Sequence, residues 1–192
     1  NAMAMDSIGV IQGIFNGEPL IQYAYLYEDE IKYLFANQNS EKPTYIFGGT
    51  LGFSAQIKGF VFSGDVNFTK GINHASNLGP VAHIPPVFGK FELVKNYKNW
   101  KFKCLFLHAG AKPANEFDEA NVDNLYETPY QDDNWIGSPK WSTLNLAVNY
   151  KLNESFKLQM NIDNILNRHY KTFSSGLSAP GRNFIFSTTI LL

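Results

Sequence analysis

The chemically distinctive part of the sequence is an acidic stretch between residues 112 and 140. Carboxylate oxygens are the ligands that hard cations such as calcium prefer. Four acids are therefore candidates for a metal site: Glu116, Asp118, Glu119 and Asp123. Their spacing matches no calcium-loop motif, and a solvated acidic loop is the simpler interpretation.

Four aromatic residues are interspersed among the seven acids of the whole stretch, namely Phe117, Tyr126, Tyr130 and Trp135. They could stack against a ligand or pack the loop together, and packing is the favoured interpretation. Arg182, in the segment "PGRNF", is a further candidate ligand contact. The flanking Gly and Pro favour a second interpretation, in which this segment is a turn that sets the register of the last strand.

The remaining chemistry argues against catalysis. The four histidines are scattered, and the sequence contains no nucleophile elbow, phosphate loop or paired-histidine spacing. We therefore expect a protein that is not an enzyme and has no cofactor. The single cysteine, Cys104, excludes an internal disulfide. A formal net charge of −1 gives no sign of a nucleic-acid partner.

The elements that carry these residues follow a period of two from residue 45 onward. In "YIFGGTLGFSAQI" and "FVFSGDVNFT", large apolar residues alternate with small or polar ones, and Lys58-Gly59 between them predicts a tight hairpin turn. Similar alternation recurs in "KFELVKNY", "WKFKCLFLH", "STLNLAVNY", "FKLQMNID" and the final "NFIFSTTILL". The pattern predicts an all-β, antiparallel, up-and-down arrangement of about seven to eight strands.

The connections between these strands alternate in length. Short turns alternate with long polar loops at residues 71–87, 111–140 and 166–181. That alternation, with strands of about ten residues, is typical of a transmembrane β-barrel. The polar face carries mostly Ser, Thr, Asn, Gln and Gly, which suits a wet lumen better than a free surface. A soluble β-barrel or sandwich that binds a small apolar ligand or a glycan remains the alternative.

The N-terminal part reads differently. The opening Asn-Ala-Met, residues 1–3, is typical of a tag remnant. Residues 4–44 are expected to hold a partial strand, a loop and one short helix near 26–37, because Tyr23, Tyr27, Ile31 and Leu34 have helical spacing. Residues 45–192 are the expected barrel strands.

The last third of the chain resembles the end of a TonB-dependent outer-membrane receptor. The resemblance is carried by Trp141 opening a strand, by "NIDNI" followed by "RHY", and by "SG" and "APGRNF" before the last strand. It extends over about residues 40–192. One departure is the terminal Leu191-Leu192, where family members usually end on an aromatic residue.

This resemblance implies more than the residues themselves do. Such receptors are 22-stranded barrels with an N-terminal plug, and they import scarce nutrients with energy passed on by TonB. It implies an outer-membrane location and, as partners, lipid, the rest of the barrel and plug, TonB and a nutrient ligand. Iron complexes are favoured, with cobalamin or a glycan as other candidates. A segment with two bare strand edges could also pair with a second copy.

Overall fold

The computed structural model describes residues 8–15, 18–27, 30–34, 43–73, 79–118 and 122–191. Its main element is a seven-stranded antiparallel sheet in the order β14-β13-β12-β7-β6-β5-β4. The strands are β4 (Thr44–Ile57), β5 (Phe60–Asn73), β6 (Phe88–Tyr97), β7 (Trp100–Ala109), β12 (Trp141–Lys151), β13 (Phe156–Asp163) and β14 (Asn183–Ile190). Sequence neighbours are sheet neighbours throughout, which confirms the predicted all-β, up-and-down architecture.

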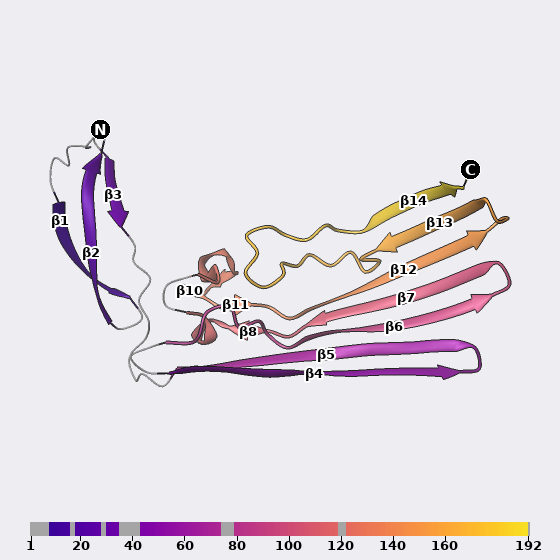
Figure 1. The fold of residues 1–192 in the computed structure, drawn as a ribbon, viewed down its shortest axis with the longest axis horizontal. Coiled ribbons are helices and arrows are strands. Elements are labelled where there is room, and N and C mark those ends of the chain that lie inside the picture. Colours follow the sequence, from indigo (N-terminus) through magenta and orange to yellow (C-terminus); the bar gives the residue numbers. More distant parts are fainter. Residues whose placement is uncertain are drawn as a thin grey trace.

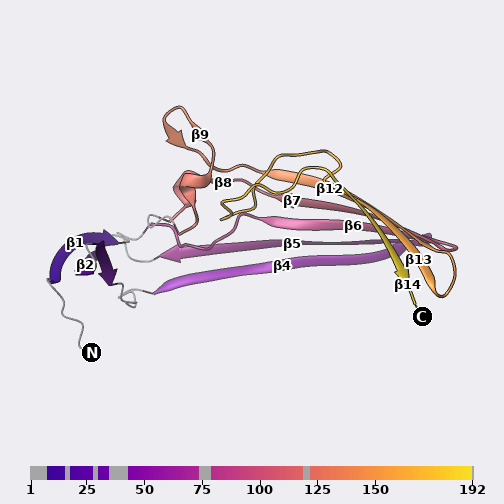
Figure 2. The same cartoon turned by 90° about the horizontal axis from the view of Figure 1, so that it is seen from above.

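Short turns join the strands at one end of this sheet, and long connections join them at the other (Figure 1). The β4–β5 turn has positive φ at both central residues, Lys58 (48°) and Gly59 (75°). That backbone matches the twist of a hairpin, and Gly59 adopts it without strain. The sheet is twisted and curved, and its long connections fold to one side of it (Figure 2).

The register places most of the large apolar residues of the seven strands on one face. One row across the sheet runs Gly64, Phe91, Phe106 and Leu144, and a neighbouring row runs Phe62, Leu93, Cys104, Leu146 and Ile162. This surface, the apolar face, is left open. Leu51 is 79% exposed and Phe186 is 74% exposed.

The opposite surface, the polar face, is tied by polar contacts between strands. Lys90 pairs with Asp65 at 3.3 Å, and Lys103 pairs with Glu92. The Thr50 hydroxyl donates to Asn67 Oδ1 at 2.6 Å. Such pairs stabilise a sheet by a few tenths of a kcal/mol up to about 1 kcal/mol each.

Burial confirms that the apolar face is not a packed core. Among the described residues, the buried hydrophobic side chains are Val94, Ala109 and Phe117. By sheet register, Val94 and Ala109 lie on the polar face, and Phe117 lies in a loop. The buried hydrophobic side chains of the described part therefore lie on the polar face or in a loop, and none lies on the apolar face.

The predicted helix near residues 26–37 is wrong. Residues on both sides of 28–29 form β2 (Glu18–Tyr27) and β3 (Glu30–Leu34), which pair with each other, and β1 (Ile8–Phe15) pairs with β2. The segment is rich in Tyr, Ile and Leu, and aromatic and β-branched residues favour extended backbone. In "LIQYAYLY" the tyrosines fit the period of a strand as well as that of a helix. The pairing of β2 with its neighbours therefore decides in favour of the strand.

Candidate functional site

The long connections fold over the polar face at one end of the sheet. A side chain at Gly71, which shares the polar face with Asp65, would meet Val81 at 2.6 Å and Ile84 at 3.0 Å. The loop that precedes β6 therefore lies directly on that face. At this end of the sheet the polar face is covered, and the apolar face is bare.

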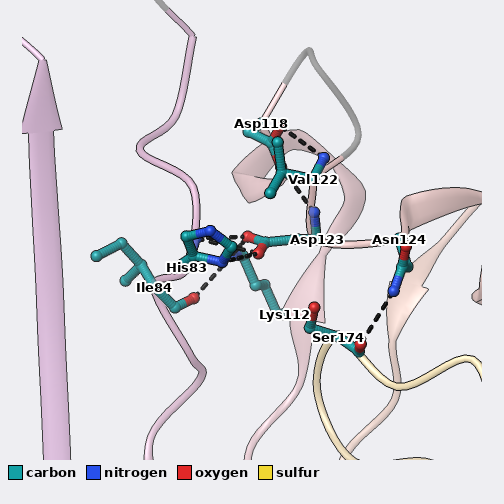
Figure 3. A network of polar contacts seen from close by, with 8 residues as sticks. All are labelled: His83, Ile84, Lys112, Asp118, Val122, Asp123, Asn124 and Ser174. Atoms are coloured by element: carbon teal, nitrogen blue, oxygen red, sulfur yellow. Dashed lines mark hydrogen bonds and ion pairs between the residues drawn. The ribbon is translucent and has the colours of Figure 1, made fainter. Parts of the chain in front are cut away.

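A buried ion pair within the central loop, with its hydrogen bonds to the loop before β6, ties these two loops together (Figure 3). Lys112, in the short strand β8 (Lys112–Pro113), contacts Asp123 at 3.1 Å, and the two residues are only 2% and 1% exposed. The Lys112 ammonium also donates to the carbonyl of Ile84 at 2.7 Å. The backbone N–H of His83 donates to both Asp123 carboxylate oxygens at 3.0 Å. We call these contacts the loop clasp.

Two aromatic rings complete the surroundings of Lys112. Its ammonium lies 4.9 Å from the ring centroid of Phe117 and 4.3 Å from that of Phe173, and the two rings meet edge to face at 5.9 Å. Cation–π attraction strengthens when water is excluded. Since Phe173 belongs to the loop before β14, the clasp links all three long loops.

Two of the four acidic metal candidates, Asp118 and Asp123, serve as hydrogen-bond acceptors for the loops. Asp118 is buried and accepts the backbone N–H groups of Val122 at 2.9 Å and Asp123 at 3.1 Å. Glu116 is exposed, and Glu119 lies outside the described residues. Within the described ranges, no group of three His, Cys, Asp or Glu side chains is placed to hold a metal ion.

Three of the four aromatic candidates come together at the tip of the central loop. Tyr130, in β9 (Tyr130–Gln131), meets Trp135, in β10 (Asn134–Trp135), at a centroid distance of 4.7 Å. Tyr126, in the 3-10 turn η2 (Leu125–Glu127), meets the same indole at 5.8 Å. Tyr126 and Tyr130 are exposed, so this cluster can offer aromatic surface to a ligand. Phe117 does not join it, because it is buried in the clasp.

Arg182 lies apart from this cluster, in the turn before β14. Its backbone N–H donates to Asn167 Oδ1 at 2.9 Å, and its side chain is exposed. The buried Asn164 holds the other side of the turn. Its amide donates to the carbonyls of Arg168 at 2.8 Å and Pro180 at 3.1 Å. These contacts fit a turn that sets the register of β14.

Two hollows open beneath the loops. The first, of about 340 Å³, contains Trp141 and Tyr170, whose rings stack at 4.2 Å, and we call it the Trp141 pocket. The second, of about 430 Å³, is lined by Pro85 and Pro86 and by polar-face residues that include Lys90. Trp141 lines both hollows. Both volumes fall in the range of small-ligand sites.

Trp141 is one of the functional candidates that the sequence analysis missed. It shares the polar face with Thr143, so it points toward the hollows rather than the apolar face. Counting by two along β12 would have revealed this. The clasp had no comparable signal, since Lys112 and Asp123 are not related by any period and His83 comes from another loop.

No helix in the described part of the chain is long and apolar enough to cross a membrane. No protein-family model matches the sequence, and no curated protein does. Among solved structures, the chain is similar to the copper transporter OprC, with a TM-score of 0.60 and 20% sequence identity. The similarity covers 77% of this chain and 23% of that protein, so the chain spans under a quarter of its length. This similarity concerns the fold alone: an all-β, antiparallel sheet of seven strands like part of that transporter.

Proposed function

We propose that this chain forms part of the wall of an outer-membrane transporter of the TonB-dependent kind. The observation that carries the proposal is the inverted distribution of residues on the sheet. Loops and buried contacts cover the polar face at the long-loop end of the sheet, and the apolar face is open across all seven strands. A sheet in water would gain free energy by covering its apolar face, at about 25 cal/mol for each Å² buried. A sheet in a bilayer needs no such cover.

The alternative of a soluble barrel or sandwich fits this distribution poorly. Its apolar faces would have to converge on a dry interior, as in any packed domain. Exposed large apolar residues instead occur on strands in every part of the sheet, such as Leu51, Phe102, Leu158 and Phe186. A second layer would have to cover all of them.

The finer features of the proposal rest on the sequence resemblance. They are a plug domain, TonB-driven opening and a nutrient ligand captured by the outer loops. The loops at the clasp would face outside, with the short turns toward the periplasm. An organic iron chelate remains our favoured ligand, because the Tyr126, Tyr130 and Trp135 rings offer flat surfaces for a planar chelator.

Cell fractionation of the native bacterium tests the location. We expect the full-length protein in the outer-membrane fraction, retained there after washes with salt and with alkaline carbonate. Recovery in the soluble fraction would refute the proposal. Uptake of a radiolabelled iron chelate by cells with and without a functional TonB then tests the mechanism. Uptake that needs the protein but not TonB would contradict an energised receptor.

A further inference from the structure

The Trp141 pocket has the composition of a binding site, and most of its lining belongs neither to the aromatic cluster nor to the loop clasp. It is lined by the stacked Trp141 and Tyr170, by the basic residues Lys140, His169 and Lys171, and by a group of hydroxyl-bearing residues: Thr128, Ser138, Thr172, Ser174 and Ser175. Apolar walls with a few convergent polar groups are typical of small-molecule sites.

One positive charge in this pocket has no acidic partner among the described residues. Its two acids are already engaged, because Asp123 pairs with Lys112 and Glu127 pairs with Lys171 at 3.6 Å. Lys171 also donates to the carbonyl of Glu127 at 2.9 Å. Lys140 is exposed and has no ion pair with any described residue. The positive charge available to a ligand is therefore that of Lys140, with the His169 imidazole as a neighbouring donor.

We propose that the Trp141 pocket binds a small organic anion that joins a flat ring to a carboxylate. The ring would lie against Trp141 and Tyr170, and the carboxylate would accept from Lys140 and the nearby hydroxyl groups. A charge-assisted hydrogen bond is shorter and about twice as strong as a neutral one, so a carboxylate is preferred over an amide of the same shape.

Binding in this pocket does not depend on the location of the protein. The role of the pocket as a ligand subsite on the uptake path is the part that rests on the proposed function. The two ideas can fail separately, because binding is measured on purified protein and location is measured in cells.

The test is isothermal titration calorimetry on the full-length protein in detergent, with 4-hydroxybenzoate as the probe and 4-hydroxybenzamide as its neutral match. We expect saturable binding of the benzoate, weakened about 10-fold by Lys140→Gln. Binding of the benzamide should be weaker and unchanged by the same substitution. The matched control is Lys101→Gln, which changes an exposed lysine at the short-turn end of the sheet. This variant should bind both probes as the parent protein does.

Trp141→Phe separates the ring from the charge. It should weaken both probes, with the preference for the benzoate retained, and circular dichroism should show an unchanged sheet. Absence of saturable benzoate binding would overturn the proposal. So would equal losses in Lys140→Gln and Lys101→Gln, or equal affinities for the two probes in the parent protein.

Discussion

A charged residue on the apolar face should destabilise the protein far more than the same residue one position away. Phe106 lies midway along β7 on the apolar face, between Phe91 and Leu144, and is 39% exposed. Its neighbour Leu105 lies on the polar face, between Glu92 and Asn145. The two positions share a strand and differ in the face they occupy.

The magnitude follows from the surroundings of each side chain. An arginine at the middle of the hydrocarbon region of a barrel costs about 2–4 kcal/mol. We therefore expect Phe106→Arg to lower the free energy of unfolding by about 3 kcal/mol, which is more than a hundredfold in the equilibrium constant. Leu105→Arg places a cation beside the carboxylate of Glu92 on a wet surface, and we expect a change under about 1 kcal/mol.

The assay is urea unfolding of the full-length protein in lipid vesicles, followed by tryptophan fluorescence. Phe106→Leu is the control for lost packing, and it should cost under about 1.5 kcal/mol. If Phe106→Arg is as stable as Leu105→Arg, the apolar face does not meet lipid. The same follows if Phe106→Leu lowers the free energy of unfolding as much as Phe106→Arg does.

The loops and turns give three further predictions. Asp123→Asn should leave the Lys112 charge buried without its partner, costing about 3 kcal/mol in the stability of the loops; hydrogen exchange at the His83 amide reports this, and unchanged protection there would contradict a clasp. Asn164 has a positive φ of 47°, and its buried side chain donates hydrogen bonds to two carbonyls, so Asn164→Ala should lower the free energy of unfolding by about 2 kcal/mol. Urea unfolding measures this, and an unchanged midpoint would contradict the role of Asn164 in the turn. The hydrogen bond from Lys151, at 2.6 Å, holds the pKa of Glu154 below its ordinary value, so its contribution is present at neutral pH and is lost as pH falls through that lowered pKa. NMR titration should show the pKa of Glu154 returning upward in Lys151→Met, and no change would contradict the pairing.

The sheet could be predicted because its information is local. Alternation along each strand decides which face a side chain occupies, and tight turns such as Lys58-Gly59 fix the pairing of neighbours. The expected helix near 26–37 failed because tyrosines four residues apart fit a helix, and alternating tyrosines fit a strand equally well. Only pairing between β2 and β3 decides between the two.

The candidate site was less predictable because it depends on contacts between loops. Phe117 and Trp135 have the same kind of sequence surroundings, yet one packs on Lys112 and the other joins an exposed cluster. Nothing near either residue in the chain encodes that difference. Whether Glu116, Asp118, Glu119 and Asp123 bind a metal stays a prediction, as does any ligand contact by Arg182.

The central claim is that the apolar face meets lipid, and Cys104 allows a direct measurement of it. This residue lies on the apolar face between Leu93 and Leu146, and the preceding residue, Lys103, lies on the polar face. A nitroxide attached at Cys104 in reconstituted protein should collide with oxygen more often than with a water-soluble nickel chelate. A nitroxide at a cysteine placed at position 103, with Cys104 changed to serine, should show the reverse preference. Nickel accessibility at Cys104 equal to that at position 103 would contradict the account.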